Sequence, residues 1–184
     1  WMNKNHQYKV RYRDLGLNPP EFICRDWIAA AFTPETDRSK QQQLVLSQSD
    51  TYLEEVMKAD VIVITSPMYN YGMPAVLKAW FDQIMRVNKT FDFDLARGDF
   101  PVEPVMSGKV LVLLTSSGEF GFGAGGVREQ MNHLGPHIKE LAKYLGADRF
   151  YEIGSEYQEF DDDRHVRSVE DAKQAMAELV EKLS

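Results

Sequence analysis

The pattern of apolar and polar positions predicts strands of two kinds. Residues 61–65 (VIVIT) and 110–114 (VLVLL) are continuous apolar runs, which are typical of strands covered by helices on both faces. Residues 8–12 (YKVRY) alternate between apolar and polar side chains, as a half-exposed strand does. Residues 150–153 (FYEI) are short and mixed, and we interpret them as an edge strand.

Helical periodicity separates these strands. Residues 42–58 carry apolar side chains broadly on one face, which predicts a helix. A second helix is predicted to begin at Pro74, which suits the first helical position, and to continue through AVLKAWFDQIM. A helix over residues 127–145 is expected to break near Gly135, because the proline that follows cannot continue it without losing a hydrogen bond. The last helix is expected to open with a capping box at Ser168. Alternating strands and helices predict an α/β fold with a parallel sheet.

The order of the strands predicts that part of the sheet lies outside this sequence. In a doubly wound sheet of order 2-1-3-4-5, the first strand lies between strands 2 and 3. The first visible strand, residues 8–12, has an edge pattern, whereas both buried strands come later. If the visible strands are numbers 2 to 5, the first strand, its loop and most of one helix are absent, roughly 30 residues for such a unit. We interpret residues 1–184 as a single, N-terminally incomplete domain.

Two loops that follow the buried strands contain the candidate chemistry. The first, PMYNYG after Ser66, offers flat side chains and backbone amides that suit a flat heteroaromatic ring. The second, residues 115–126 (TSSGEFGFGAGG), is rich in glycine, which lets backbone amides approach a ligand closely. Each loop alone is also compatible with a structural role, as a tight connection or a surface loop. Because ligands bind beyond the carboxyl ends of the strands in such sheets, the two loops together favour a ligand site.

Composition narrows the class of protein. The chain has 21 basic and 28 acidic residues and a net charge of −7, which argues against non-specific binding to nucleic acid or to an anionic membrane. Cys24 is the single cysteine, so an intramolecular disulfide and cysteine-based zinc sites are excluded. No apolar run approaches the about 20 residues of a membrane span, and no signal peptide opens the chain, so we expect a cytoplasmic protein. The acids at 161–163 beside His165 are interpreted as solvated, and no metal site is expected.

The run PMYNYGMPAVLKAWFDQIMRVNKTF resembles the signature of FMN-dependent NADH-azoreductases, in the wider flavodoxin-like family of NAD(P)H-quinone oxidoreductases. The resemblance continues through RDLGLNPP, LVLSQSDTYLEEVMKADVIVITSP and GKVLVLLTSSG, and it weakens toward the C-terminus. It implies a flavodoxin-like fold, FMN as cofactor, NADH or NADPH as electron donor, and ping-pong electron transfer to quinones or azo compounds. It also implies a homodimer, for which Phe91, Phe93 and Phe100 are candidate contacts, although core positions are equally compatible with these residues.

The resemblance further implies which residues bind FMN. Those expected to flank the isoalloxazine ring are Pro67, Met68, Tyr69, Asn70 and Tyr71, and those expected to approach its polar edge are Ser116, Ser117, Gly118 and Glu119. No side chain is expected to act as a nucleophile. Relatives often have a histidine just after the serine-glycine loop, where this chain has Glu119-Phe120-Gly121, so solvent is the expected proton source. His133 and His137, on the following helix, are interpreted as solvated or structural.

Two other functions are compatible with the same fold. The acidic charge also suits a one-electron carrier of the flavodoxin type, although the PMYNYG loop followed by LKAW fits the oxidoreductases better. The resemblance implies that a serine-containing loop after the missing first strand holds the FMN phosphate at a helix N-terminus. Because this phosphate loop is not in the sequence, a regulatory or interaction domain without flavin is the other alternative.

Overall fold

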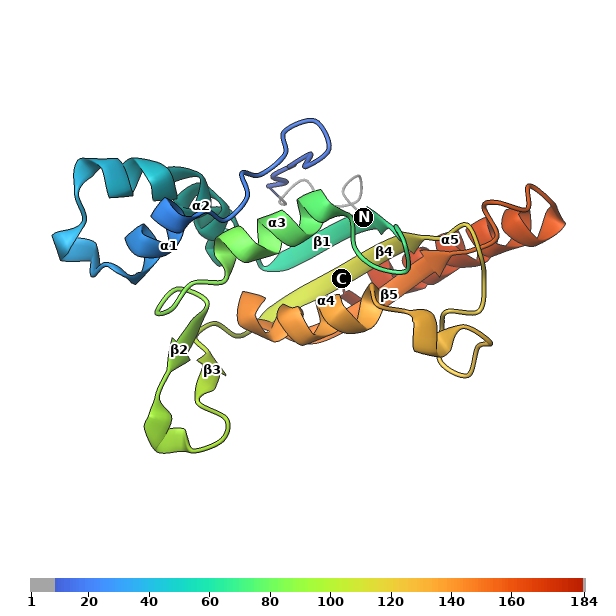
Figure 1. Cartoon of the computed structure of the whole chain (residues 1–184). Coiled ribbons are helices and arrows are strands. Elements are labelled where there is room, and N and C mark those ends of the chain that lie inside the picture. The colour runs from blue at the N-terminus through green and yellow to red at the C-terminus, as the bar shows by residue number, and fades with distance from the viewer. Residues whose placement is uncertain (1–8, 184) are drawn as a thin grey trace.

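The computed structural model describes residues 9–183 and has helices on both faces of a parallel sheet (Figure 1). In chain order the α-helices and strands are α1 (Arg25–Phe32), α2 (Lys40–Lys58), β1 (Val61–Pro67), α3 (Ala75–Ile84), β2 (Phe91–Phe93), β3 (Val102–Pro104), β4 (Lys109–Ser116), α4 (Gly135–Ala142), β5 (Ala147–Ser155) and α5 (Asp163–Leu183). Single 3₁₀ turns are η1 (Glu35–Asp37), η2 (Leu95–Arg97), η3 (Glu129–Met131) and η4 (Lys143–Leu145).

The main sheet confirms the α/β prediction. Its strand order is β1-β4-β5, and both pairings are parallel. The predicted strands at residues 61–65, 110–114 and 150–153 lie within β1, β4 and β5, and β5 is at an edge as expected. Strands β2 and β3 form a separate antiparallel hairpin that projects from the body of the molecule (Figure 1).

The strand predicted over residues 8–12 is not formed. Tyr8 lies outside the described residues, and residues 9–12 have irregular backbone. Arg11 and Arg13 both bind the Glu55 carboxylate on α2, each through its Nε, at 2.9 and 2.6 Å. Alternating side chains form a strand only beside a partner strand, and this segment lies against a helix instead.

Two predicted helices have different bounds. Residues 127–134 contain only a 3₁₀ turn, because the Arg128 N–H donates to the Gly121 carbonyl at 2.8 Å and folds this stretch back as a loop. Ser168 lies inside α5, which begins at Asp163, so Ser168 does not cap the helix. Its Oγ accepts the N–H of Glu156 at 2.9 Å and ties α5 to the end of β5.

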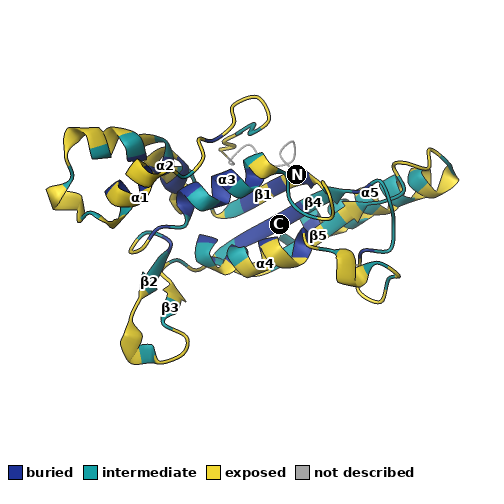
Figure 2. Cartoon of the chain, viewed as in Figure 1, coloured by how far each residue is buried: buried dark blue, intermediate teal, exposed yellow. Residues whose placement is uncertain are grey.

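Apolar layers cover both faces of the sheet because side chains alternate along each strand. Leu111 and Leu113 of β4 are fully buried against α2, α3 and α4, whereas Val110 and Val112 pack on Leu179 of α5. Figure 2 shows the buried residues gathered along the sheet and α3, with exposed residues on the outlying helices and the hairpin.

The outer edge of β1 is open. Within residues 9–183 no strand pairs with it. Val63 on β1 is 57% exposed, whereas Val112 on the neighbouring strand is 4% exposed. An apolar, unpaired edge is a feature that natural sheets normally cover. This edge is where the order 2-1-3-4-5 puts the central strand.

We expect Leu111→Ala to destabilise the protein by about 3 kcal/mol, because it leaves a cavity at the centre of the sheet. The control is Leu44→Ala on α2, where the leucine is 65% exposed and its loss should cost less than about 0.5 kcal/mol. Urea denaturation followed by circular dichroism measures both. Equal unfolding free energies for the two variants would contradict this account of the core.

Candidate functional site

The two predicted loops start side by side at the carboxyl edge of the sheet. The last residue of β1, Pro67, is opposite the last residue of β4, Ser116, in the parallel ladder. The pairing extends one residue further, since the Met68 N–H donates to the Ser116 carbonyl at 2.8 Å. The register of the sheet therefore brings the loops together.

The first loop contains a tight turn with a left-handed backbone. Tyr69 and Gly72 exchange two backbone hydrogen bonds, at 2.9 and 3.0 Å, across Asn70 and Tyr71. Asn70 has φ 49° and Tyr71 has φ 66°. Asparagine tolerates this region, but a tyrosine there is unusual and strained, and such strain is found preferentially at functional sites. The surroundings hold Tyr71 in place, because its carbonyl accepts the His133 N–H at 2.8 Å.

The glycine-rich loop is anchored at both ends. At the start, the Ser117 N–H donates to the Ser155 carbonyl at 2.9 Å, and the buried Ser117 hydroxyl donates to the Glu119 carbonyl. At the other end, Arg128 pairs with the Glu119 carboxylate at 2.8 Å and covers the Phe120 ring. The Glu119 side chain is thus engaged by Arg128 rather than free to contact a ligand.

A third loop, after β5, binds the glycine-rich loop. Three consecutive amides, of Tyr157, Gln158 and Glu159, donate to the carbonyls of Glu119, Ser117 and Gly118 at 3.1–3.2 Å. Aromatic stacking strengthens the junction, with the rings of Phe120 and Tyr157 parallel and 4.5 Å apart. The sequence pattern did not predict this loop as part of the site.

The three loops border one cavity of about 490 Å³ that is open to solvent and is lined by Pro67, Met68, Tyr69, Ser116, Gly118, Gln158 and Glu159. Gly118 packs closely against the third loop, because a Cβ built on it would lie 2.4 Å from Cγ of Glu159 and would displace that side chain. The cavity lies at the edge where ligands bind in sheets of this kind.

Five of the nine residues predicted to bind the cofactor line this cavity: Pro67, Met68, Tyr69, Ser116 and Gly118. The other four lie on the same loops without lining it. Tyr71 packs its ring against Phe122 at 6.2 Å, and Ser117 is buried beneath the glycine-rich loop. The sequence reasoning missed Gln158 and Glu159, and no local pattern distinguishes them from an ordinary polar loop.

Backbone N–H groups are available around the cavity. Within residues 9–183, the amides of Asn70, Tyr71, Gly118 and Glu119 donate to no protein acceptor. They belong to the turn of the first loop and to the start of the glycine-rich loop. Unused amides beside apolar walls can bind carbonyl and ring-nitrogen acceptors of a flat ligand.

The two histidines considered in the sequence analysis lie at the start of α4. His133 precedes α4 instead of lying on a helix as predicted, and His137 is in the first turn of α4.

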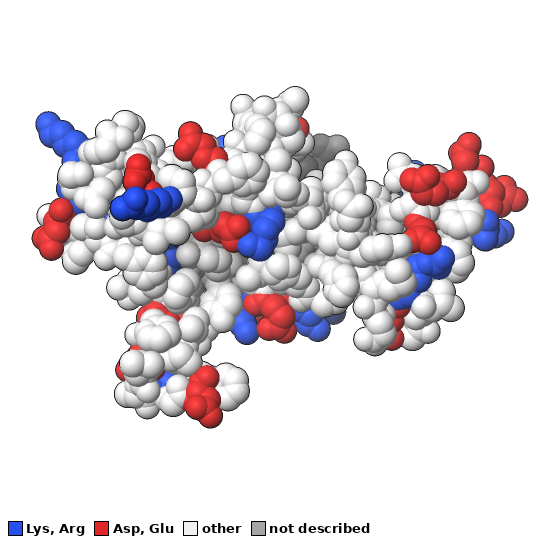
Figure 3. Space-filling model, viewed as in Figure 1, with Lys and Arg blue, Asp and Glu red and all other residues white. Residues whose placement is uncertain are grey.

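In the described part of the chain, no three His, Cys, Asp or Glu side chains gather closely enough to hold a metal ion. None of the helices in residues 9–183 is long and apolar enough to cross a membrane. Acidic and basic side chains are interspersed on the face shown in Figure 3.

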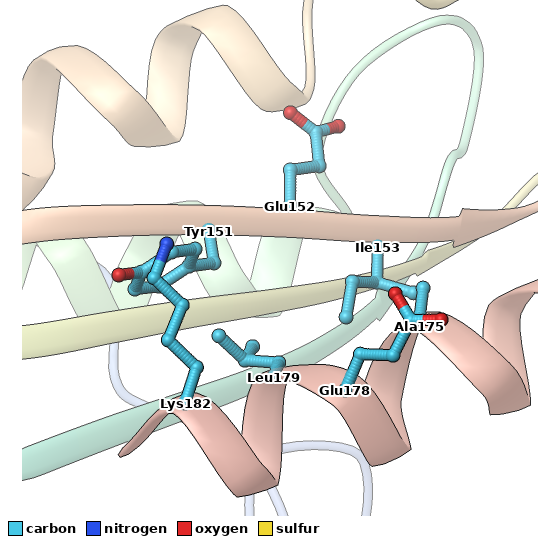
Figure 4. A pocket seen from close by; sticks show the side chains of 7 residues that line it. All are labelled: Tyr151, Glu152, Ile153, Ala175, Glu178, Leu179 and Lys182. Carbon is cyan, nitrogen blue, oxygen red and sulfur yellow. The ribbon is translucent and has the colours of Figure 1, made fainter.

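A second cavity, of about 260 Å³, lies between β5 and α5, where Lys182 covers the Tyr151 ring at 5.1 Å (Figure 4). Glu152 projects from the opposite face of β5, away from the helix (Figure 4). Its carboxylate lies against Gly135, and burial there raises its pKa. The residues that line this second cavity all belong to β5 and α5, and none of them lies on the three loops.

Comparison with known proteins agrees with this fold. A family model described as "Flavodoxin-like fold" matches residues 1–180. The FMN-dependent NADH:quinone oxidoreductase 2 of Colwellia psychrerythraea is 63% identical over 183 residues, covering all of this chain and 84% of the relative. The protein of the same name from Idiomarina loihiensis is 60% identical, covering all of this chain and 77% of the relative.

Solved structures show the same fold at low sequence identity. An azoreductase from Bacillus anthracis superposes with a TM-score of 0.85 at 19% identity, covering 98% of this chain and 85% of the other. An FMN-dependent NADH-azoreductase from the same species, solved in complex with FMN, gives a TM-score of 0.70 at 16% identity, over 86% of this chain and 75% of the other. The family match, the identities and the coverage together show that the chain belongs to the flavodoxin-like family of FMN-dependent NADH:quinone oxidoreductases.

Proposed function

We propose that the protein binds FMN in the cavity formed by the three loops and uses it to transfer electrons from NADH or NADPH to quinones or azo compounds. The observation that carries this proposal is that Pro67, Met68 and Tyr69 line one cavity at the carboxyl edge of the sheet together with Gly118, whose backbone amide has no acceptor within residues 9–183. Family membership supports it, since the relatives are named for FMN, NADH and quinone.

The lining residues fit an isoalloxazine ring. Pro67, Met68 and Tyr69 provide an apolar wall, while Ser116 and Gly118 lie opposite, on the adjoining strand and loop. We propose that all nine residues of the predicted set form the ring site, with the Asn70, Tyr71, Gly118 and Glu119 amides as hydrogen-bond donors. Donors fixed in the protein before the ligand arrives cost little to reorganise when negative charge develops near them.

The protein's own contribution is orientation, electrostatics and exclusion of side reactions. When bound, FMN would supply the two-electron chemistry, accepting a hydride from the nicotinamide and reducing the acceptor in a separate half-reaction, which is a ping-pong scheme. The backbone amides of Gly118 and Glu119 would stabilise the negative charge of the reduced state. Tyr69, which is 59% exposed, would flank the place where donor and acceptor enter in turn.

The proton for the acceptor is proposed to come from solvent. No histidine or cysteine is among the residues that line the cavity. The backbone of His133 contacts the Tyr71 carbonyl, but its side chain makes no hydrogen bond within the described residues. Water enters a site open to solvent without help from a protein acid.

We also propose that the enzyme is a cytoplasmic homodimer. The β2–β3 hairpin carries three exposed apolar side chains, since Phe93, Leu95 and Phe100 are 53%, 75% and 85% exposed. Exposed apolar side chains clustered on one projection favour association with another protein. Phe91, the third aromatic residue suggested from the sequence, is half-buried against Tyr144 and is a weaker candidate.

We expect the full-length gene product to bind FMN and to turn over menadione with NADH. Anaerobic NADH should bleach the flavin absorbance stoichiometrically, and menadione should restore it, because both half-reactions use the same cavity. Stopped-flow absorbance measures each half-reaction. Reduction without turnover of menadione would indicate an electron carrier, and a colourless protein that ignores added FMN would indicate a flavin-free domain.

Gly118→Ala should weaken FMN binding by about tenfold or more, or roughly 1.4 kcal/mol, because the new methyl group displaces Glu159 at the cavity wall. Gly123→Ala is the matched control, since a Cβ there meets nothing within 4 Å. Quenching of FMN fluorescence gives both dissociation constants. If the two alanine variants bind FMN equally well, the cavity is not the flavin site.

Replacing Phe93 and Phe100 together by serine should convert the dimer to monomer at micromolar concentration. The reason is that their apolar side chains lose the area that would be buried between subunits. Sedimentation velocity compares the wild type with this double variant. Leu17→Ser, at a residue that is 80% exposed on a different segment, should leave the sedimentation coefficient unchanged. A wild-type monomer would refute the dimer.

A further inference from the structure

Glu156, the first residue after β5, binds the glycine-rich loop through both oxygens of its carboxylate. Oε2 accepts the Gly121 N–H at 3.0 Å, and Oε1 accepts the Phe122 N–H at 3.1 Å. Hydrogen bonds to a charged acceptor are stronger than those between neutral groups, and two on one carboxylate fix its direction as well. The sequence gives no sign of this contact, because 34 and 35 residues separate the partners.

The main chain of Glu156 is itself fixed to α5. Its N–H donates to Ser168 Oγ at 2.9 Å, and its carbonyl lies 3.1 Å from Nδ1 of His165, which donates when that nitrogen carries the proton. Both partners lie in the first two turns of a 21-residue helix that packs along β5. The carboxylate is therefore held by a rigid element.

Phe122 links the glycine-rich loop to the first loop. Phe122 is 6% exposed, and its ring lies 6.2 Å from that of Tyr71, which is in the strained turn. The Phe122 carbonyl accepts from Asn132, whose side-chain oxygen in turn accepts the N–H of Leu134 ahead of α4. A single residue, Phe122, thus connects the Glu156 carboxylate to both the turn of the first loop and the start of α4.

We propose that Glu156 is a positioning residue for the flavin ring. It holds the glycine-rich loop and, through Phe122, the turn at Tyr71 in the arrangement that binds the ring. Glu156 does not line the cavity, so it acts through the loops and not by contact with the ligand. This inference rests on the proposed function. If the loop were released, the ligand would have to order it, and the entropy cost would appear as lost affinity.

The position of Glu156 indicates that it contributes to the arrangement of the loops and little to the stability of the fold. Glu156 lies beyond the end of the sheet, and within residues 9–183 its carboxylate forms hydrogen bonds only with the loop amides of Gly121 and Phe122. Its loss removes no apolar contact from the buried clusters on either face of the sheet. The melting temperature of the apoprotein should therefore respond little to a change that strongly affects ligand binding.

The test is Glu156→Gln in the full-length protein. Glutamine keeps the size of the side chain but removes the charge and sets an amide NH₂ against a backbone N–H. We expect the dissociation constant of FMN to rise about 10- to 100-fold, as for loss of hydrogen bonds to a charged group. Riboflavin should lose the same factor, because the positioned part is the ring and not the phosphate group. Hydrogen exchange should accelerate at Gly121 and Phe122, with the apoprotein melting within a few degrees of wild type.

Glu170→Gln is the matched control. Glu170 is exposed on α5, and its side chain makes no hydrogen bond or ion pair within the described residues, so the same charge is removed without touching the loops. Its flavin affinity and exchange rates should equal those of the wild type. Ser168→Ala is a second, milder variant that removes the anchor of the Glu156 main chain, and it should raise both dissociation constants by a smaller factor.

The measurements distinguish failure of the positioning role of Glu156 from failure of the proposed function. Faster exchange at Gly121 and Phe122 with unchanged flavin affinity would overturn the positioning role, as would a loss for FMN that riboflavin does not share. If Glu156→Gln fails to fold, Ser168→Ala decides, and an unchanged dissociation constant in that variant refutes the role. A wild-type protein that binds no flavin refutes the proposed function itself, which distinguishes that failure from the failure of Glu156.

Discussion

Seven residue pairs join β1 to β4 in parallel register, from Val61 with Val110 to Pro67 with Ser116. The site depends on this pairing, because it ends both strands at the same level and starts both loops from adjacent positions. A shift of one residue would turn the buried side chains of β1 to the other face and separate the Met68 amide from the Ser116 carbonyl. The hydrophobic packing of Leu111 and Leu113 against one helical layer, with Val110 and Val112 against α5, keeps the register in place.

Polar contacts beyond the sheet hold the glycine-rich loop of the proposed site in place. Amides of the loop after β5 bind three carbonyls of the glycine-rich loop, and the Glu156 carboxylate binds two of its amides. The strained backbone of Tyr71 persists because its carbonyl and its ring are both held by neighbours. Loops that are already held in place before a ligand arrives lower the entropy cost of binding.

The cavity is suited to one part of the cofactor. Its lining contains apolar, hydroxyl and amide side chains and one carboxylate, but no lysine or arginine. Such a lining suits a neutral ring with hydrogen-bonding edges better than a phosphate group, which requires cations or a cluster of amides. The relatives named for FMN are longer than this chain, which covers 84% and 77% of the two most similar ones described above.

The sequence by itself determined the parallel α/β sheet, because continuous apolar strands such as 61–65 and 110–114 can be buried only between helical layers. It also located the two loops, since the PMYNYG and glycine-rich segments follow those strands directly. Only the tertiary structure showed that residues 9–12 lie on α2 without forming a strand, because ion pairs with Glu55 depend on contacts 42 and 44 residues apart. Likewise, Gln158 and Glu159 join the site through backbone amides, which every residue carries, so no choice of side chain could have revealed their place beside the cavity.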